Sequence, residues 1–150
     1  MTWSDLRDLI AGRGLRVSET GPEPAAGGAV AGIMHDSREA RPGQVFVALK
    51  GLHADGTAFA RDAVTRGALA VMAEQPAPPG IGVPWMVVSD ARLALALGAA
   101  RYYGDPSLET QVVGITGTNG KTTVSFLVAS MFEAAGVRCG VLGTRRRNAR

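Results

Sequence analysis

The sequence has little of several residue types that mark particular classes of protein. It contains one cysteine, Cys139, so neither an internal disulfide nor a cluster of thiolate metal ligands can form. Charged residues make up 19% and aromatic residues 5%, while hydrophobic residues reach 46%, which is typical of a globular protein. The surroundings of Cys139 in "GVRCGVLG" predict a buried strand and an inert core thiol.

Long apolar runs are also missing. No run reaches the roughly 18 residues that a membrane-spanning helix needs. The N-terminal stretch "MTWSDLRDLIAGRG" carries Asp5 and Asp8 among its apolar residues, which argues against a signal peptide. We therefore expect a soluble, cytoplasmic protein with no membrane partner.

Basic residues are in excess only at the C-terminus. The chain has 16 lysines and arginines against 13 acidic residues. Without the basic residues of the tail "RRRNAR", 12 basic residues remain against 13 acidic ones, so the body of the protein is near neutral. This distribution predicts no nucleic-acid partner, and the tail is interpreted as a solvated chain end rather than a small nucleic-acid patch. The basic residues of the tail are Arg145, Arg146, Arg147 and Arg150.

The apolar periodicity of the first hundred residues predicts an α/β protein. A helix is expected over residues 4–13, with Ser4 as its cap, followed by a Pro/Gly-rich connection over 18–29. A later helix over 91–104 is expected to turn Leu93, Leu97 and Ala100 inward. Further helix is expected over 55–68, and strands over 29–34, 45–49, 69–73 and 85–89.

A second pattern begins after the turn-rich break "GDPSLET" at 104–110. A strand over 112–116, a glycine loop, a helix over about 121–135 and a strand over 138–143 form a predicted βαβ unit with parallel strands. We therefore predict two domains, residues 1–107 and 108–150.

The stretch "VVGITGTNGKTT" at 112–123 has the character of a phosphate-binding loop. It departs from the common pattern G-x-x-x-x-G-K-[ST], because position 115 is isoleucine. Glycines let the backbone approach an anion, and the free N–H groups at the start of a helix can bind it. Lys121 would add a positive charge near the phosphates, and Thr122 a hydroxyl for Mg²⁺. The alternative is a glycine-rich turn without a ligand.

The motif "TGTNGKTT" resembles the ATP loop of the Mur ligase superfamily, whose members activate a carboxylate as an acyl phosphate and join it to an amine. The stretch "DSREARPGQVFVALKGLHADGTAFARDAVTRGALAVMAE" is similar to the N-terminal domain shared by the MurE and MurF types. Asp36-Ser37-Arg38 and the form Thr-Gly-Thr-Asn-Gly-Lys favour the MurE type. So do "RYYGDPS" before the loop and "GVLGT" after the helix.

The resemblance implies a substrate-binding N-terminal domain followed by the first strand, P-loop, helix and strand of a truncated ATPase domain. It implies ATP- and Mg²⁺-dependent addition of meso-diaminopimelate or lysine to UDP-N-acetylmuramoyl-L-alanyl-D-glutamate in peptidoglycan synthesis, by a monomer. The ATP loop would comprise Gly117, Thr118, Asn119, Gly120, Lys121, Thr122 and Thr123, with Lys121 the catalytic residue and Thr122 a magnesium ligand. The uridine end of the substrate would contact His35, Ser37, Leu52, His53 and Ala54.

Other interpretations remain open at this stage. The family's carbamylated lysine and its C-terminal domain have no counterpart here, so the 150-residue chain alone is expected to be inactive. The chain could also be a fragment of a MurF-type ligase, or a non-catalytic module that binds a nucleotide or UDP-sugar. Without the resemblance, His35 and His53 would be ordinary loop histidines, and Asp36 and Arg38 would simply pair or cap a turn.

Overall fold

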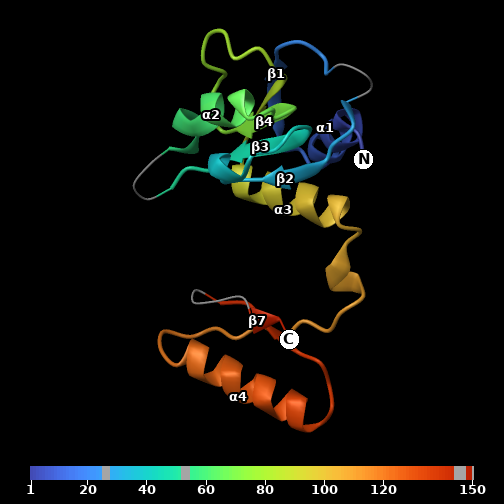
Figure 1. Cartoon of the computed structure of the whole chain (residues 1–150), viewed down its shortest axis with the longest axis vertical. Helices are drawn as coiled ribbons and strands as arrows, with labels where there is room; N and C mark the ends of the chain where they lie inside the picture. The colour runs from blue at the N-terminus through green and yellow to red at the C-terminus, as the bar shows by residue number, and fades with distance from the viewer. Residues whose placement is uncertain (25–27, 52–54, 144–147, 150) are drawn as a thin grey trace. The chain divides into compact units, whose positions relative to one another are not determined.

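The computed structural model describes residues 1–24, 28–51, 55–143 and 148–149. Contacts within the chain divide it into two compact units, Met1–Glu109 and Thr110–Arg150 (Figure 1). The domain limits expected at 107 and 108 remain a prediction. The basic residues of the C-terminal tail lie outside the described residues. In the described part of the chain, no helix has both the length and the apolar character needed to cross a membrane.

The first unit is built on a five-stranded sheet with the strand order β1-β5-β4-β3-β2. Strands β2 to β5 are parallel to their neighbours, and β1 pairs antiparallel with β5 at one edge. This arrangement confirms the predicted α/β class. The strands are β1 (Arg16–Thr20), β2 (Gly32–Met34), β3 (Gln44–Ala48), β4 (Ala70–Ala73) and β5 (Trp85–Val88).

Helices cover both faces of this sheet, which explains why its central strands are continuously apolar. Helices α1 (Trp3–Gly12) and α3 (Ala91–Tyr102) pack on one face, where Val45 and Val47 belong to their cluster. The short helices η3 (Gly56–Phe59) and α2 (Ala60–Thr65) lie on the other face, whose cluster contains Phe46 and Trp85 (Figure 1). Successive β3 residues therefore enter two separate cores, as strand geometry requires.

The start of α1 differs from the prediction. Thr2, not Ser4, is its N-cap. The Thr2 hydroxyl accepts a hydrogen bond from the Asp5 backbone N–H at 3.1 Å, and the Asp5 carboxylate accepts one from the Thr2 N–H at 2.7 Å. This reciprocal capping box satisfies two N–H groups that the helix itself leaves without partners, and a cap at Ser4 would lack the acidic residue three positions on.

The inner face of α3 was predicted only in part, because Leu97 packs against the core cluster but Leu93 does not. Leu93 is 45% exposed, whereas Ala91, Ala94 and Gly98 are buried. A Cβ placed on Gly98 would lie 2.8 Å from the Ile33 Cδ1 atom, so the helix approaches the sheet through its smallest residues. Periodicity in an alternating Leu/Ala segment does not distinguish this close packing from a leucine-lined face.

Strand β1 occupies part of the segment expected to be a connection. Residues 18–20 pair with 85–87 of β5, and a register shift lies between Arg16 and Ser18. Tertiary pairing with β5 supplies backbone hydrogen bonds that no local pattern in "SETGPEP" indicates.

The second unit departs further from expectation. Its main element is α4 (Lys121–Ala134), and β6 (Gly140–Val141) pairs antiparallel with β7 (Asn148–Ala149). Residues 112–116 are not in a strand, so the expected parallel pairing is absent from the described residues. Cys139 is only half-buried, because β6 pairs with a short following strand and is not enclosed in a sheet with two covered faces.

Gly56 provides a test of the packing between β3 and η3. A Cβ at this position would lie 2.7 Å from both the backbone N and O atoms of Leu49, which cannot move aside as a side chain can. We expect Gly56→Ala to lower the free energy of unfolding by about 1–3 kcal/mol in urea titrations followed by tryptophan fluorescence. The matched control is Gly12→Ala, where a Cβ meets nothing within 4 Å. Equal stability of the two variants would contradict the close contact.

Candidate functional site

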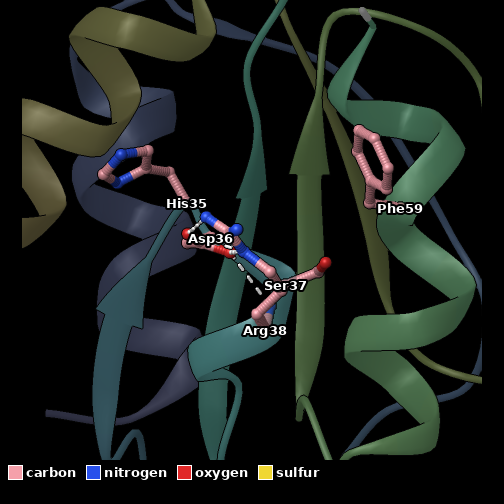
Figure 2. Close-up of a pocket in the computed structure, with 5 residues that line it drawn as sticks. All are labelled: His35, Asp36, Ser37, Arg38 and Phe59. Atoms are coloured by element: carbon pink, nitrogen blue, oxygen red, sulfur yellow. Dashed lines mark hydrogen bonds and ion pairs between the residues drawn. The ribbon is translucent and has the colours of Figure 1, made fainter.

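A pocket opens where β2 ends. It has a volume of about 340 Å³ and is lined by His35, Asp36, Ser37, Arg38 and Phe59 (Figure 2). The first four follow β2 directly and continue into the short helix η2 (Ser37–Glu39). Because β2 and β3 are parallel, their carboxyl ends meet at one edge of the sheet, which is where open α/β sheets place ligands. The structure thus brings together His35 and Ser37, two of the predicted site residues.

Phe59 belongs to this pocket and was not predicted as a site residue. It belongs to the helix expected over 55–68, in which the spacing puts it on one helical face with Ala63 and Val64. Instead it ends η3 with 48% of its surface exposed and faces the hollow beside η2. No signal in the sequence distinguishes this aromatic ring from a core residue. The next residue along the chain, Ala60, is fully buried.

A fork of hydrogen bonds fixes the turn at the pocket. The Asp36 carboxylate caps η2 by accepting from the Arg38 backbone N–H at 3.0 Å. The Arg38 guanidinium donates to both carboxylate oxygens, from Nη2 at 2.6 Å and from Nε at 2.9 Å. The side-chain bonds from Arg38, followed by its backbone bond, lower the pKa of Asp36 to about 2. Since the Arg38 side chain is 82% exposed, the pair orders the turn more than it stabilises the fold.

Ser37 stands out at the centre of this turn. It is the one polar residue among the described residues that is classed as buried, at 7% exposure. In Figure 2 its hydroxyl points from η2 toward the helix that carries Phe59. The hydroxyl is therefore held between two elements rather than extended into solvent.

The predicted residues Leu52, His53 and Ala54 lie outside the described residues. The residues that flank them are described. Lys50 and Asp55 form an antiparallel bridge, and the Asp55 carboxylate accepts from the Thr57 N–H at 2.9 Å and from its hydroxyl at 2.7 Å. Lys50 and Asp55 therefore lie next to each other just after β3.

The glycine loop in the second unit has a conformation that needs its glycines. Gly117 and Gly120 have φ angles of 149° and 77°, which other residues rarely adopt. Gly120 is the N-cap of α4, and no side chain caps that helix end. The Lys121 ammonium donates to the carbonyl oxygens of Gly117 at 2.5 Å and of Thr118 at 3.3 Å.

This loop can accommodate a phosphate group. A helix N-terminus without a side-chain cap offers N–H donors, and the adjacent ammonium supplies positive charge. The Thr122 and Thr123 residues are exposed in the first turn of α4, so their hydroxyls remain accessible. The other predicted loop residue, Asn119, lies between the two glycines and is also exposed.

The pKa of Asp36 gives a direct test of the fork at the pocket. Because the folded pKa lies below the ordinary value of 3.8, the stabilising contribution is present above pH 3.8 and is lost as the pH falls through about 2. We expect a carboxyl NMR titration of Asp36 to have its midpoint near pH 2, and Arg38→Ala to return it toward 3.8. Arg66→Ala, which removes a partner of a different aspartate, should leave Asp36 unchanged. A wild-type midpoint near 3.8 would exclude the fork.

The chain is similar in sequence and in fold to known ligases. The UDP-N-acetylmuramoyl-L-alanyl-D-glutamate–2,6-diaminopimelate ligase of Chlorobium phaeobacteroides is 46% identical over 127 residues, which cover 80% of this chain and 25% of the relative. A solved structure of a ligase with this name has a TM-score of 0.59 at 31% identity, covering 79% of this chain and 24% of the other. The MurF ligase of Thermotoga maritima in complex with ADP has a TM-score of 0.54 at 32% identity, covering 71% and 24%.

The chain spans about a quarter of the length of these relatives. Two family profiles also match it. Residues 29–103, half of the chain, match the Mur ligase family, catalytic domain, and residues 115–149 match the Mur ligase middle domain. The pocket lies within the first match, and the loop from Gly117 to Thr123 within the second. On these grounds, the chain belongs to the Mur ligase family.

Proposed function

We propose that this chain is part of a MurE-type ligase that joins a diamino acid to UDP-N-acetylmuramoyl-L-alanyl-D-glutamate in an ATP-dependent reaction. The observation that carries the proposal is the presence of both a pocket and a phosphate-type loop in a chain 46% identical to a ligase of that name. The diamino acid named for that relative is 2,6-diaminopimelate. Lysine is the other candidate from the sequence.

The pocket after β2 is proposed to hold the uridine end of the substrate. Its volume of about 340 Å³ suits a base and part of a ribose, and its lining combines an apolar ring with polar groups. Ser37 and His35 lie on one side and Phe59 on the other (Figure 2). Leu52, His53 and Ala54 are proposed as further contacts of the uridine end, on the resemblance alone.

The glycine loop is proposed to hold ATP. When bound, ATP supplies the phosphoryl group that activates the substrate carboxylate as an acyl phosphate. The backbone N–H groups at the start of α4 bind the phosphates, and the Lys121 ammonium exchanges its two carbonyl partners for phosphate oxygens. Thr122 is the residue that would hold Mg²⁺ beside the nucleotide, because it follows the lysine in the first turn of the helix.

A MurF-type ligase is the second candidate, and the similarity to the Thermotoga maritima MurF structure supports it. We favour the MurE type because the pocket turn reads Asp36-Ser37-Arg38 and the loop has threonine at position 118. A module that binds UDP-sugar or ATP without catalysis is the third candidate. Activity of this segment within a complete ligase separates the third candidate from the first two.

Replacement of Ser37 tests the proposed uridine pocket. We expect the full 150-residue chain to bind UDP-N-acetylmuramoyl-L-alanyl-D-glutamate in calorimetric titrations, and Ser37→Ala to weaken binding roughly tenfold, the consequence of losing one hydrogen bond in a buried position. Ser18→Ala, on the exposed edge strand β1, serves as the matched control and should bind like wild type. Identical affinity of the Ser37 and Ser18 variants would remove Ser37 from the site.

Replacement of Lys121 tests the proposed ATP loop. In a chimera where this chain replaces the matching segment of the Chlorobium phaeobacteroides ligase, Lys121→Ala should lower turnover by about 10²–10³-fold, because the lysine is the only cation of the loop. Arg138→Ala removes an exposed cation of the same unit away from the loop and should leave turnover unchanged. The 150-residue chain by itself should release no ADP and serves as the inactive reference. Normal turnover by the Lys121 variant would exclude the assignment.

A further inference from the structure

The forked pair at the pocket leaves one edge of the Arg38 guanidinium unused. A guanidinium has two edges that can each donate two parallel hydrogen bonds, one formed by Nε and Nη2 and the other by Nη1 and Nη2. The Asp36 carboxylate occupies the first edge, at 2.9 Å from Nε and 2.6 Å from Nη2. No acceptor among the residues that the structure describes bonds to Nη1. The second edge is therefore free to bind an anion that comes from outside the protein.

The pair with Asp36 holds this free edge in a defined place beside the pocket. Arg38 lines the pocket, and in Figure 2 its guanidinium folds back over the turn to lie next to the Asp36 carboxylate. Its side chain is 82% exposed, so a ligand can reach it from solvent. A long side chain that would otherwise sample many rotamers is thus ordered before any ligand binds, which lowers the entropic cost of binding.

The chemistry of a uridine nucleotide determines which of its groups reaches this edge. A volume of about 340 Å³ accommodates a base and part of a ribose, so the rest of the ligand lies outside the pocket. The diphosphate is bonded to the ribose through its 5′ oxygen and is the first anionic group beyond the sugar. Its oxygens match the paired donors of a guanidinium edge, as phosphate groups in general do.

We propose that Arg38, oriented by Asp36, binds the diphosphate of the uridine nucleotide through its Nη1 and Nη2 edge. This inference rests on the proposed function of the pocket. Asp36 is a positioning residue in this arrangement, because it acts on the ligand through Arg38. Ser37 and Arg38 then bind different parts of one ligand, the nucleoside and the phosphates.

Neighbouring charges and solvent limit the strength of this interaction. The Asp36 carboxylate offsets part of the positive charge of Arg38, and Glu39 adds a second, exposed carboxylate on the same short helix. The guanidinium is also largely in water, where interactions between charges are weakened. We therefore expect the diphosphate to raise the affinity of the nucleoside by about tenfold, the effect of a charge-assisted pair that remains partly solvated.

The test compares uridine with UDP by calorimetric titration of the full chain, at low ionic strength and without Mg²⁺. Wild type should bind UDP about tenfold more tightly than uridine. Arg38→Ala should bring the two affinities within about twofold and leave the affinity for uridine unchanged. Arg38→Lys should lose most of the preference too, because an ammonium keeps the charge but not the paired donors. Asp36→Asn should lower the preference to about threefold, because an amide oxygen holds the guanidinium by fewer bonds.

Arg16→Ala is the matched control. Arg16 is an exposed arginine paired with a carboxylate, that of Glu19 at 3.2 Å, but it lies on β1 at the opposite edge of the sheet from β2. This variant should keep the wild-type preference, and an equal loss of preference would overturn the inference, since overall charge would then explain the effect.

Three further outcomes are decisive. An unchanged preference for UDP in Arg38→Ala would overturn the inference and leave the uridine pocket in place. A stronger preference in Asp36→Asn would overturn the positioning role, because the removal of a negative charge would then outweigh the loss of orientation. Failure of wild type to bind either uridine or UDP would overturn the inference together with the proposed pocket.

Discussion

The arrangement of the first unit depends on the burial of strand β3 between two apolar clusters. Val45 and Val47 enter the cluster shared with α1 and α3, while Phe46 and Ala48 enter the one shared with α2. These four residues are at most 2% exposed, so a one-residue slip of the strand would exchange the contents of both cores. The register of β3 with β2 is consequently well determined, and with it the position where β2 ends and the pocket turn begins.

The pocket combines interactions of short and long range. Asp36 and Arg38 are two residues apart, and their forked pair would order the turn in almost any fold that left it exposed. Ser37 is different, because its burial requires α2 to pack against η2. A local turn thus presents the serine, and the tertiary structure buries it. If the proposed function holds, recognition of the substrate depends on both.

In the second unit, interactions between neighbouring residues dominate. The conformation of its glycine loop depends on the backbone freedom of Gly117 and Gly120 and on the hydrogen bond that Lys121 donates to the Gly117 carbonyl. These residues lie within a stretch of five. Helix α4 meanwhile leaves Phe126, Leu127 and Met131 substantially exposed, and only Ala129 of this helix is buried. Local geometry is therefore sufficient to form a phosphate-type loop, while the apolar surface of α4 is not enclosed by the residues that the structure describes.

The sequence by itself determined those features that arise from neighbouring residues or from strong periodicity. The apolar runs at 45–49, 69–73 and 85–89 correspond to β3, β4 and β5, and Asp36 and Arg38 both pair and cap a turn, as the plain alternative for these residues had it. Only the tertiary structure decided that residues 18–20 pair with β5, that α3 packs through Ala94 and Gly98, and that residues 112–116 join no described strand. It also placed Phe59 at the pocket that contains Ser37, more than twenty positions away along the chain. The physical reason is that strand pairing, close helix packing and the contacts of a pocket depend on residues distant in sequence, whose positions no local propensity specifies.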